Sequence, residues 1–221
     1  MLSERVAQVR ETLRRESAPW GRMPRLIAVT KYSPVEDILP LLDCGVTDIG
    51  ENRVQVLRDK LPYLEGKFSI HLIGQLQSNK VKYIIKDVCL IHSLDHPSLA
   101  QEIDRQAQKA GIRMPALIQV NIAREPQKGG VPEEELFPFL RQCAQLPGLK
   151  VNGLMAMMPL GAPEDALLSW FTRMRQLLDQ CAQEAVNHTE MTELSMGMSQ
   201  DYGLAARCGA TMVRVGSALF R

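Results

Sequence analysis

Eight short runs rich in Val, Ile, Leu and Met recur along the chain, and longer stretches with helical spacing separate them. Each run is almost continuously apolar, which is typical of strands in a parallel sheet that helices cover on both faces. The expected strands lie at 25–31, 46–52, 69–74, 88–94, 115–122, 151–157, 193–199 and 211–217. Strands and helices in this alternation predict an α/β protein.

The number of strand–helix units predicts a single-domain (β/α)8 barrel of the TIM type, with a doubly wound open sheet as the alternative. No GxGxxG turn follows the first run, although an open dinucleotide-binding sheet usually has one there. A length of 221 residues with 45% hydrophobic residues suits one domain over 1–221. Because the chain ends soon after the eighth run, we expect an N-terminal helix over 2–18 to complete the covering layer.

The expected helices have recognisable starts, stripes and stops. Ser33, Pro34 and Glu36 predict a capping box with proline in the first helical position, and Gly45 supplies a stop. Pro40 and Pro138 lie too far into their expected helices for a first-turn position, so we expect a kink or an early break at each. The longest helix has an apolar stripe, formed by Leu167, Phe171, Met174, Leu178, Cys181 and Ala185.

Composition excludes several classes of partner. The 26 Lys and Arg residues nearly balance the 25 Asp and Glu residues, and no block of like charges predicts nucleic-acid binding. No apolar run approaches the length of a membrane span. The five cysteines are scattered without a CxxC pair, as expected of reduced, mostly buried thiols. We therefore expect a cytoplasmic protein without a nucleic-acid or membrane partner.

Polar residues follow nearly every expected strand, where barrels of this type place their chemistry. They are Lys31, Glu51, Asn52, Gln75, Ser93, Asn121, Ser199, Arg214, Gly216 and Ser217. Ordinary polar capping explains some of these positions, but it explains Lys31 and Arg214 least well. Lys31 is expected in the last position of the first strand, with its amine across the barrel mouth. A partly desolvated lysine can be a nucleophile toward aldehydes, and a lysine that snorkels to the rim is the alternative.

The last two strands predict an anion site opposite this lysine. Ser199 is expected to cap a helix that Gly209 ends, so the first backbone amides of that helix are free donors. Gly216 and Ser217 follow the eighth strand, and the loops after these two strands commonly hold phosphate in such barrels. The alternative is that Asp201 satisfies the helix dipole without a ligand.

A reactive amine opposite a phosphate cradle fits an aldehyde that carries a phosphate. Arg214 lies two residues before Gly216 on the same face of the strand, so it can reach the ring of such a ligand. A charged guanidinium beside a pyridine nitrogen keeps that nitrogen unprotonated, which weakens the electron sink that carbanion chemistry needs.

These residues lie in motifs that resemble the pyridoxal phosphate homeostasis protein family, whose members are single-domain relatives of the N-terminal barrel of alanine racemase. The motifs span nearly the whole chain: AVTKYSP, IGENRVQ, HLIGQLQSNK, VNIAREPQKGG, GLMAMMP, LSMGMSQD and TMVRVGSALF. The resemblance implies a pyridoxal 5'-phosphate (PLP) barrel of fold type III without the C-terminal β-domain.

The resemblance also implies roles for individual residues. Lys31 would carry PLP as an internal aldimine, and Arg214 would face the pyridine nitrogen. Ser199, Gly216 and Ser217 would hold the phosphate. Asn52 would lie beside the cofactor, while His71 and Asn79 would line or brace the same end of the barrel. For His71, inside a strand, a hydrogen-bonded core histidine is an equal alternative.

Two segments depart from the family pattern. The stretch IAREPQKGG, which contains Lys128, replaces a segment of small residues, and the chain ends in Arg221 where relatives commonly end in glycine. Neither is expected to touch the cofactor residues.

Racemases with this barrel use two bases, one of them supplied by the C-terminal β-domain of a partner subunit. The chain has no residues left for that domain, so we expect a monomeric, non-catalytic carrier. It would buffer PLP or supply it to apo-enzymes. A PLP-dependent amino-acid racemase, and an aldolase that uses Lys31 without a cofactor, remain the alternatives.

Overall fold

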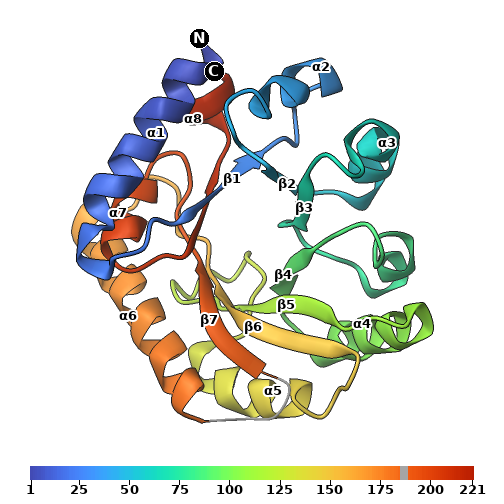
Figure 1. The fold of residues 1–221 in the computed structure, drawn as a ribbon. Helices are drawn as coiled ribbons and strands as arrows, with labels where there is room; N and C mark the ends of the chain where they lie inside the picture. Colours follow the sequence, from blue (N-terminus) through green and yellow to red (C-terminus); the bar gives the residue numbers. More distant parts are fainter. Residues whose placement is uncertain (185–188) are drawn as a thin grey trace.

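The computed structural model describes residues 1–184 and 189–221. Eight parallel strands follow one another around a closed barrel in chain order (Figure 1), which confirms the barrel and excludes the open sheet. The strands are β1 (Arg25–Val29), β2 (Asp48–Glu51), β3 (Ser69–Leu72), β4 (Leu90–Leu94), β5 (Met114–Gln119), β6 (Leu149–Met155), β7 (Thr189–Ser195) and β8 (Met212–Val215).

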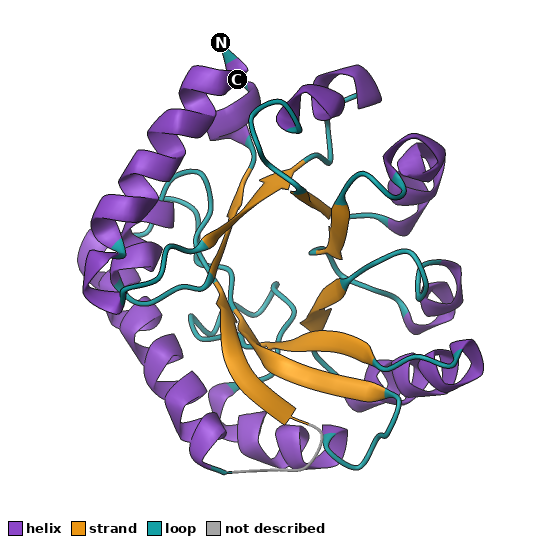
Figure 2. Ribbon diagram, viewed as in Figure 1, coloured by secondary structure: helices purple, strands orange, loops and turns teal. Residues whose placement is uncertain are grey.

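Helices surround the barrel on its outside (Figure 2). The α-helices are α1 (Leu2–Glu16), α2 (Val35–Ile38), α3 (Val54–Leu64), α4 (Pro97–Ala110), α5 (Leu136–Cys143), α6 (Glu164–Gln183), α7 (Tyr202–Arg207) and α8 (Ser217–Phe220). Short 3₁₀ helices are η1 (Ala18–Trp20), η2 (Leu39–Leu41), η3 (Ser78–Tyr83) and η4 (Glu133–Glu135).

Helix α1 completes the covering layer, as the sequence predicts. It buries Val6, Val9 and Leu13 and packs against α7 and α8, so the two ends of the chain lie side by side (Figure 1). Helix α6 buries most of its predicted stripe, whereas Leu167 is partly buried and Ala185 lies outside the described residues. A smaller, separate apolar cluster consists of five strand residues: Ile27, Leu90, Leu117, Met155 and Met212.

Several strands end earlier than predicted. Strand β1 stops at Val29, so Lys31 lies in a turn beyond the strand and not in its last position. The segment predicted at 193–199 is displaced toward the N-terminus, because β7 ends at Ser195. Gly197, with a φ of 91°, then takes the chain out of the extended conformation. The segments that line the barrel mouth are therefore loops, which apolar periodicity does not distinguish from strand ends.

The predictions for the two prolines have different outcomes. At Pro40 the break is confirmed, since α2 ends at Ile38 and a 3₁₀ turn follows. At Pro138 the prediction is wrong, because α5 begins only at Leu136 and the proline is its third residue. A first-turn proline costs no intrahelical hydrogen bond, since the amides there have no partner within the helix.

The prediction of a capping box that starts at Ser33 is also wrong. Pro34 is the N-cap of α2, and no side chain caps this helix. The stop at Gly45 is confirmed by its left-handed backbone, with a φ of 67°.

All five cysteines are free. Cys143, Cys181 and Cys208 are buried and Cys44 is half-buried, but Cys89 is exposed. None of the helices in the described ranges is both long and apolar enough to cross a membrane.

Barrel closure requires a close backbone approach at Gly153, where β6 pairs with β7. A Cβ atom there would lie 1.8 Å from the carbonyl oxygen of Glu193. We predict that Gly153→Ala lowers the free energy of unfolding by about 3 kcal/mol, because the two strands must separate. The matched control is Gly66→Ala, where φ is also positive but no atom lies within 4 Å. This control should lose about 1 kcal/mol in urea unfolding, and equal losses would contradict the prediction.

Candidate functional site

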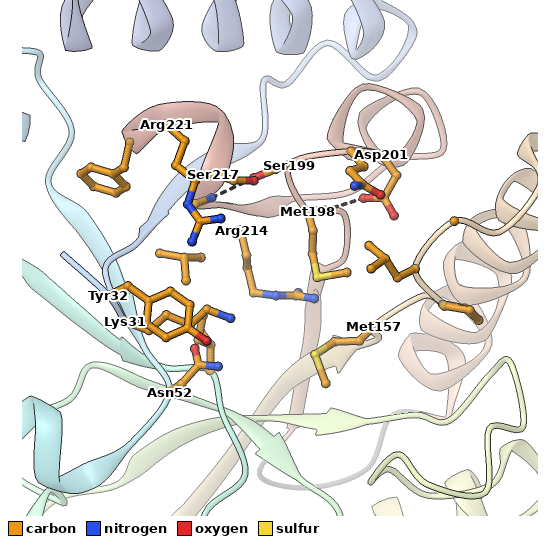
Figure 3. Close-up of a pocket in the computed structure, with 18 of the residues that line it drawn as sticks. Lys31, Tyr32, Asn52, Met157, Met198, Ser199, Asp201, Arg214, Ser217 and Arg221 are labelled. Carbon is orange, nitrogen blue, oxygen red and sulfur yellow. Dashed lines mark hydrogen bonds between the residues drawn. The ribbon is translucent and has the colours of Figure 1, made fainter.

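One cavity of about 520 Å³ lies at the C-terminal ends of the strands, among the loops that follow β1, β2, β6, β7 and β8 (Figure 3). Six of the eight predicted site residues line it: Lys31, Asn52, Ser199, Arg214, Gly216 and Ser217. These residues come from both ends of the chain. The fold therefore brings residues from the first and the last quarter of the sequence into one cavity.

Lys31 lies at the rim of this cavity. Its side chain is exposed, and its amine lies 5.0 Å from the ring centroid of Tyr32, which is itself 79% exposed. The prediction of a partly desolvated amine in the last position of the first strand is therefore wrong, because β1 ends two residues before Lys31. The amine is accessible from the cavity and from solvent.

A buried ion pair braces the backbone immediately before Lys31. Glu51 is fully buried, and its Oε1 accepts hydrogen bonds from Thr30 Oγ1 at 2.6 Å and from Lys60 Nζ at 2.7 Å. Lys60 Nζ also donates to the backbone oxygen of Thr30 at 2.8 Å. Glu51 is predicted from the sequence as a polar residue at a strand end. Lys60, nine residues further along on α3, is not predicted, because a lysine on an outer helix is ordinarily solvated.

Asn52 follows this carboxylate and presents an unpaired atom. Its Oδ1 is buried and has no hydrogen-bond partner among the described residues. Gly74 allows the Asn52 backbone to pass closely, since a Cβ at Gly74 would lie 2.2 Å from the backbone oxygen of Asn52. A buried acceptor without a partner is uncommon and often marks a site that a ligand completes.

Ser199 does not have the predicted capping role. Asp201 is the N-cap of α7, and its Oδ1 accepts from the backbone amide of Met198, so Ser199 does not cap this helix. The Oγ of Ser199 instead accepts from the amides of Gly216 at 3.0 Å and Ala218 at 3.2 Å. The hydroxyl thus joins the loop after β7 to the start of α8. Burial raises the pKa of the Asp201 carboxyl above its usual value, against the lowering effect of the Met198 amide.

Arg214 reaches from β8 into the cavity, toward Met157 and Met198 (Figure 3). Its side chain is almost completely buried. Nη1 donates to Ser195 Oγ at 2.6 Å, and Nη2 donates to the backbone oxygen of Ala156 at 2.8 Å. Burial lowers the pKa of the guanidinium to about 10, which still leaves it charged at neutral pH.

His71 and Asn79 are not among the residues that line the cavity. His71 is fully buried, with Nδ1 3.0 Å from His92 Nε2 and Nε2 3.1 Å from Asp48 Oδ1. These partners match the core-histidine alternative, because they lie inside the barrel. Asn79 is exposed on η3 in the outer layer.

Of the two segments that depart from the family pattern, one lies away from the cavity and the other lines it. Lys128 donates to the backbone oxygen of Met158 and does not line the cavity. Arg221 does line it, so the expectation that the chain end avoids the predicted site is wrong. The reason is that α8 begins at Ser217, directly after the loop that lines the cavity, and is so short that its C-cap Arg221 also lies beside the cavity (Figure 3).

Comparison with known proteins places this barrel in a family. A sequence model described as "Alanine racemase, N-terminal domain" matches residues 5–221. The pyridoxal phosphate homeostasis protein of Aquifex aeolicus is 40% identical, over 98% of this chain and 96% of that protein. PipY of Synechococcus elongatus, solved without PLP, is 34% identical with a TM-score of 0.91 over 100% of both chains. A structure of PipY with PLP bound has a TM-score of 0.89.

The chain belongs to the pyridoxal phosphate homeostasis protein family. Its likeness to alanine racemase is one of fold. The Corynebacterium glutamicum racemase has a TM-score of 0.73 at 16% identity, and the match covers 98% of this family member but 61% of the racemase chain.

The Glu51–Lys60 pair generates a stability prediction. We expect Lys60→Met to lower the free energy of unfolding by about 4 kcal/mol, because a buried carboxylate loses its countercharge. Adding Glu51→Gln should restore most of this loss, since the buried charge is then removed. Urea unfolding of both variants measures the difference, and no rescue by the second change would contradict the prediction.

His92 generates a pH prediction. Complete burial lowers its pKa well below 6.5, so the folded protein keeps the ring neutral while the unfolded chain takes up a proton near pH 6.5. Stability should therefore be constant above pH 6.5 and fall below it, by up to about 1.4 kcal/mol per pH unit. Urea midpoints at pH 7.5, 6.5 and 5.5 test this. A flat profile for the unaltered protein would exclude the effect.

Proposed function

We propose that this chain binds PLP in the mouth cavity and acts in PLP homeostasis, as the names of its relatives state for them. The observation that carries the proposal is the convergence of an amine, a guanidinium, an unpaired amide oxygen and two hydroxyls in one cavity. PLP offers a complementary group to each: an aldehyde, a ring nitrogen, a ring hydroxyl and a phosphate.

The site fits PLP in size and in chemistry. A cavity of about 520 Å³ is within the range of small-molecule sites. The buried Oδ1 of Asn52 needs a donor, and a ring hydroxyl can supply one. The Oγ of Ser199 accepts from the Gly216 amide, so its own hydroxyl proton stays available as a donor. With the hydroxyl of Ser217, which also lines the cavity, this end can donate to an anion.

We assign Lys31 as the amine that holds the cofactor covalently through its aldehyde carbon. The Glu51–Lys60 brace limits movement of the backbone before Lys31, so the amine stays at the rim. When bound, PLP supplies an electron sink for carbanion chemistry. Arg214, being charged, donates a hydrogen bond to a ring nitrogen and thereby favours its unprotonated form, which weakens that sink.

A weakened electron sink supports a carrier that has little or no catalytic activity. We propose that the chain buffers PLP or supplies it to apo-enzymes, as a monomer in the cytoplasm. Five free cysteines agree with a reducing compartment. Light scattering with size-exclusion chromatography tests the monomer, and a dimer at micromolar concentration would contradict it.

Covalent trapping tests the proposed function directly. We expect the purified protein with PLP to be yellow and borohydride to fix the cofactor on Lys31, as peptide mass spectrometry can show. Lys31→Ala should abolish trapping and weaken retention at least tenfold, because the covalent bond is lost. The control is Lys80→Ala, at an exposed lysine outside the cavity. Undiminished retention in Lys31→Ala, or an unmodified Lys31, would overturn the proposal.

The racemase alternative makes a separate prediction. An amino-acid racemase would incorporate solvent deuterium at the α-carbon of a substrate, with saturable turnover far above that of free PLP. We expect no such turnover when the common amino acids are screened with the loaded protein. An aldolase that uses Lys31 alone would instead be colourless and would trap a sugar phosphate with borohydride.

A further inference from the structure

A chain of polar side chains crosses the barrel interior beneath the cavity. Ser195, His92 and His71 are completely buried, and Arg214 lies at the cavity end of the chain. Asp48, at the start of β2, lies at the opposite end. Barrel interiors are usually filled by branched apolar residues, and a buried polar group is costly unless it is hydrogen-bonded. This chain is therefore a specific feature that the cavity alone does not explain.

Four consecutive contacts connect the two ends. Arg214 Nη1 lies 2.6 Å from Ser195 Oγ, which lies 2.9 Å from His92 Nδ1. His92 Nε2 lies 3.0 Å from His71 Nδ1, and His71 Nε2 lies 3.1 Å from Asp48 Oδ1. Every ring nitrogen of the two histidines thus has one partner, and the contacts follow one another without a gap.

If both rings are neutral, the chemistry at the two ends gives one direction to every bond. A carboxylate only accepts, so His71 donates from Nε2 to Asp48, and a neutral His71 then accepts at Nδ1. His92 consequently donates from Nε2 and, when neutral, accepts at Nδ1 from the hydroxyl of Ser195. The hydroxyl oxygen remains free to accept from Arg214, which can only donate. Burial lowers the pKa of His92, which agrees with a neutral ring.

The hydrogen-bonded series ends at Arg214, the residue that the proposed function assigns to the ring nitrogen of PLP. No described carboxylate forms an ion pair with Arg214; its two terminal nitrogens are held by Ser195 and by the Ala156 carbonyl. A hydroxyl that donates to His92 becomes a stronger acceptor for Arg214, since consecutive hydrogen bonds polarise one another. The nearby Asp201 carboxyl partly offsets the effect of burial on the pKa of Arg214, whereas Asp48 lies at the far end of the hydrogen-bonded series.

We propose that Ser195, His92, His71 and Asp48 form a proton-ordered chain that positions Arg214 for the ring nitrogen of the bound cofactor. The proton order is a property of the ligand-free protein. The positioning role rests on the proposed function.

The proton order can be tested without a ligand. Long-range ¹H–¹⁵N correlation spectra of histidine-labelled protein at pH 7.5 should show His71 and His92 as neutral rings protonated at Nε2. Asp48→Asn should give His71 a mixture of tautomers, because an amide can either donate or accept. A ring protonated at Nδ1, or a charged imidazolium, in the unaltered protein would overturn the proposed order.

The positioning role is tested by comparing PLP with its carbocyclic analogue, in which carbon replaces the ring nitrogen. Ser195→Ala should weaken PLP binding about tenfold, roughly the contribution of one hydrogen bond to a charged group, and leave the analogue unchanged. An equal loss for both ligands would indicate a general structural role and overturn the positioning proposal. An unchanged affinity for PLP would overturn it as well.

The matched control is Ser93→Ala. Ser93 is another buried serine of the barrel, but it does not belong to the hydrogen-bonded series that ends at Arg214. Its Oγ donates to the backbone oxygen of Gly74 at 2.7 Å. It should leave the ratio of the two affinities unchanged. If the unaltered protein binds neither ligand, the proposed function fails together with the positioning role, whereas the tautomer result is unaffected.

Discussion

The ladder between the first and the last strand is the constraint on which the site depends. Strand β1 pairs with β8 in parallel, with Ala28 opposite Val215. This register places the turn that carries Lys31 beside the loop that contains Gly216, although the two residues are far apart along the chain. The same strand order without closure would leave these segments at opposite edges. Closure therefore creates the site, and the α1 helix that packs on α7 and α8 covers the seam.

The mouth and the interior differ in how charge is accommodated. At the mouth, the Glu51–Lys60 pair is short and braces the backbone before Lys31. In the interior, Arg214 is held by neutral partners, and its countercharge is more distant. A charge with neutral partners keeps donor capacity for a ligand, whereas a direct carboxylate partner would compete for it.

Much of the fold could be read from the sequence because apolar runs and helical stripes report burial directly. The barrel and the N-terminal helix were predictable in this way. The six cavity residues were predicted from their positions after the expected strands and from the resemblance to the family. Strand ends were not, because Met196 and its neighbours remain apolar after the chain has left β7. Lys60 was missed because a lysine on an outer helix is ordinarily solvated. Ser195 and His92 gave no signal, since single polar residues inside apolar runs resemble ordinary strand positions.

The sequence by itself determined the class of fold, the family motifs and the residue types that PLP would need. The tertiary structure decided which of those residues meet. It placed His71 in the interior, left Asn79 on the surface and brought Arg221 to the mouth. It also showed that Ser199 bonds to the start of α8 and does not cap α7. The physical reason is that periodicity along a chain reports local burial, whereas partners across a closed barrel depend on strand register and on the paths of the loops.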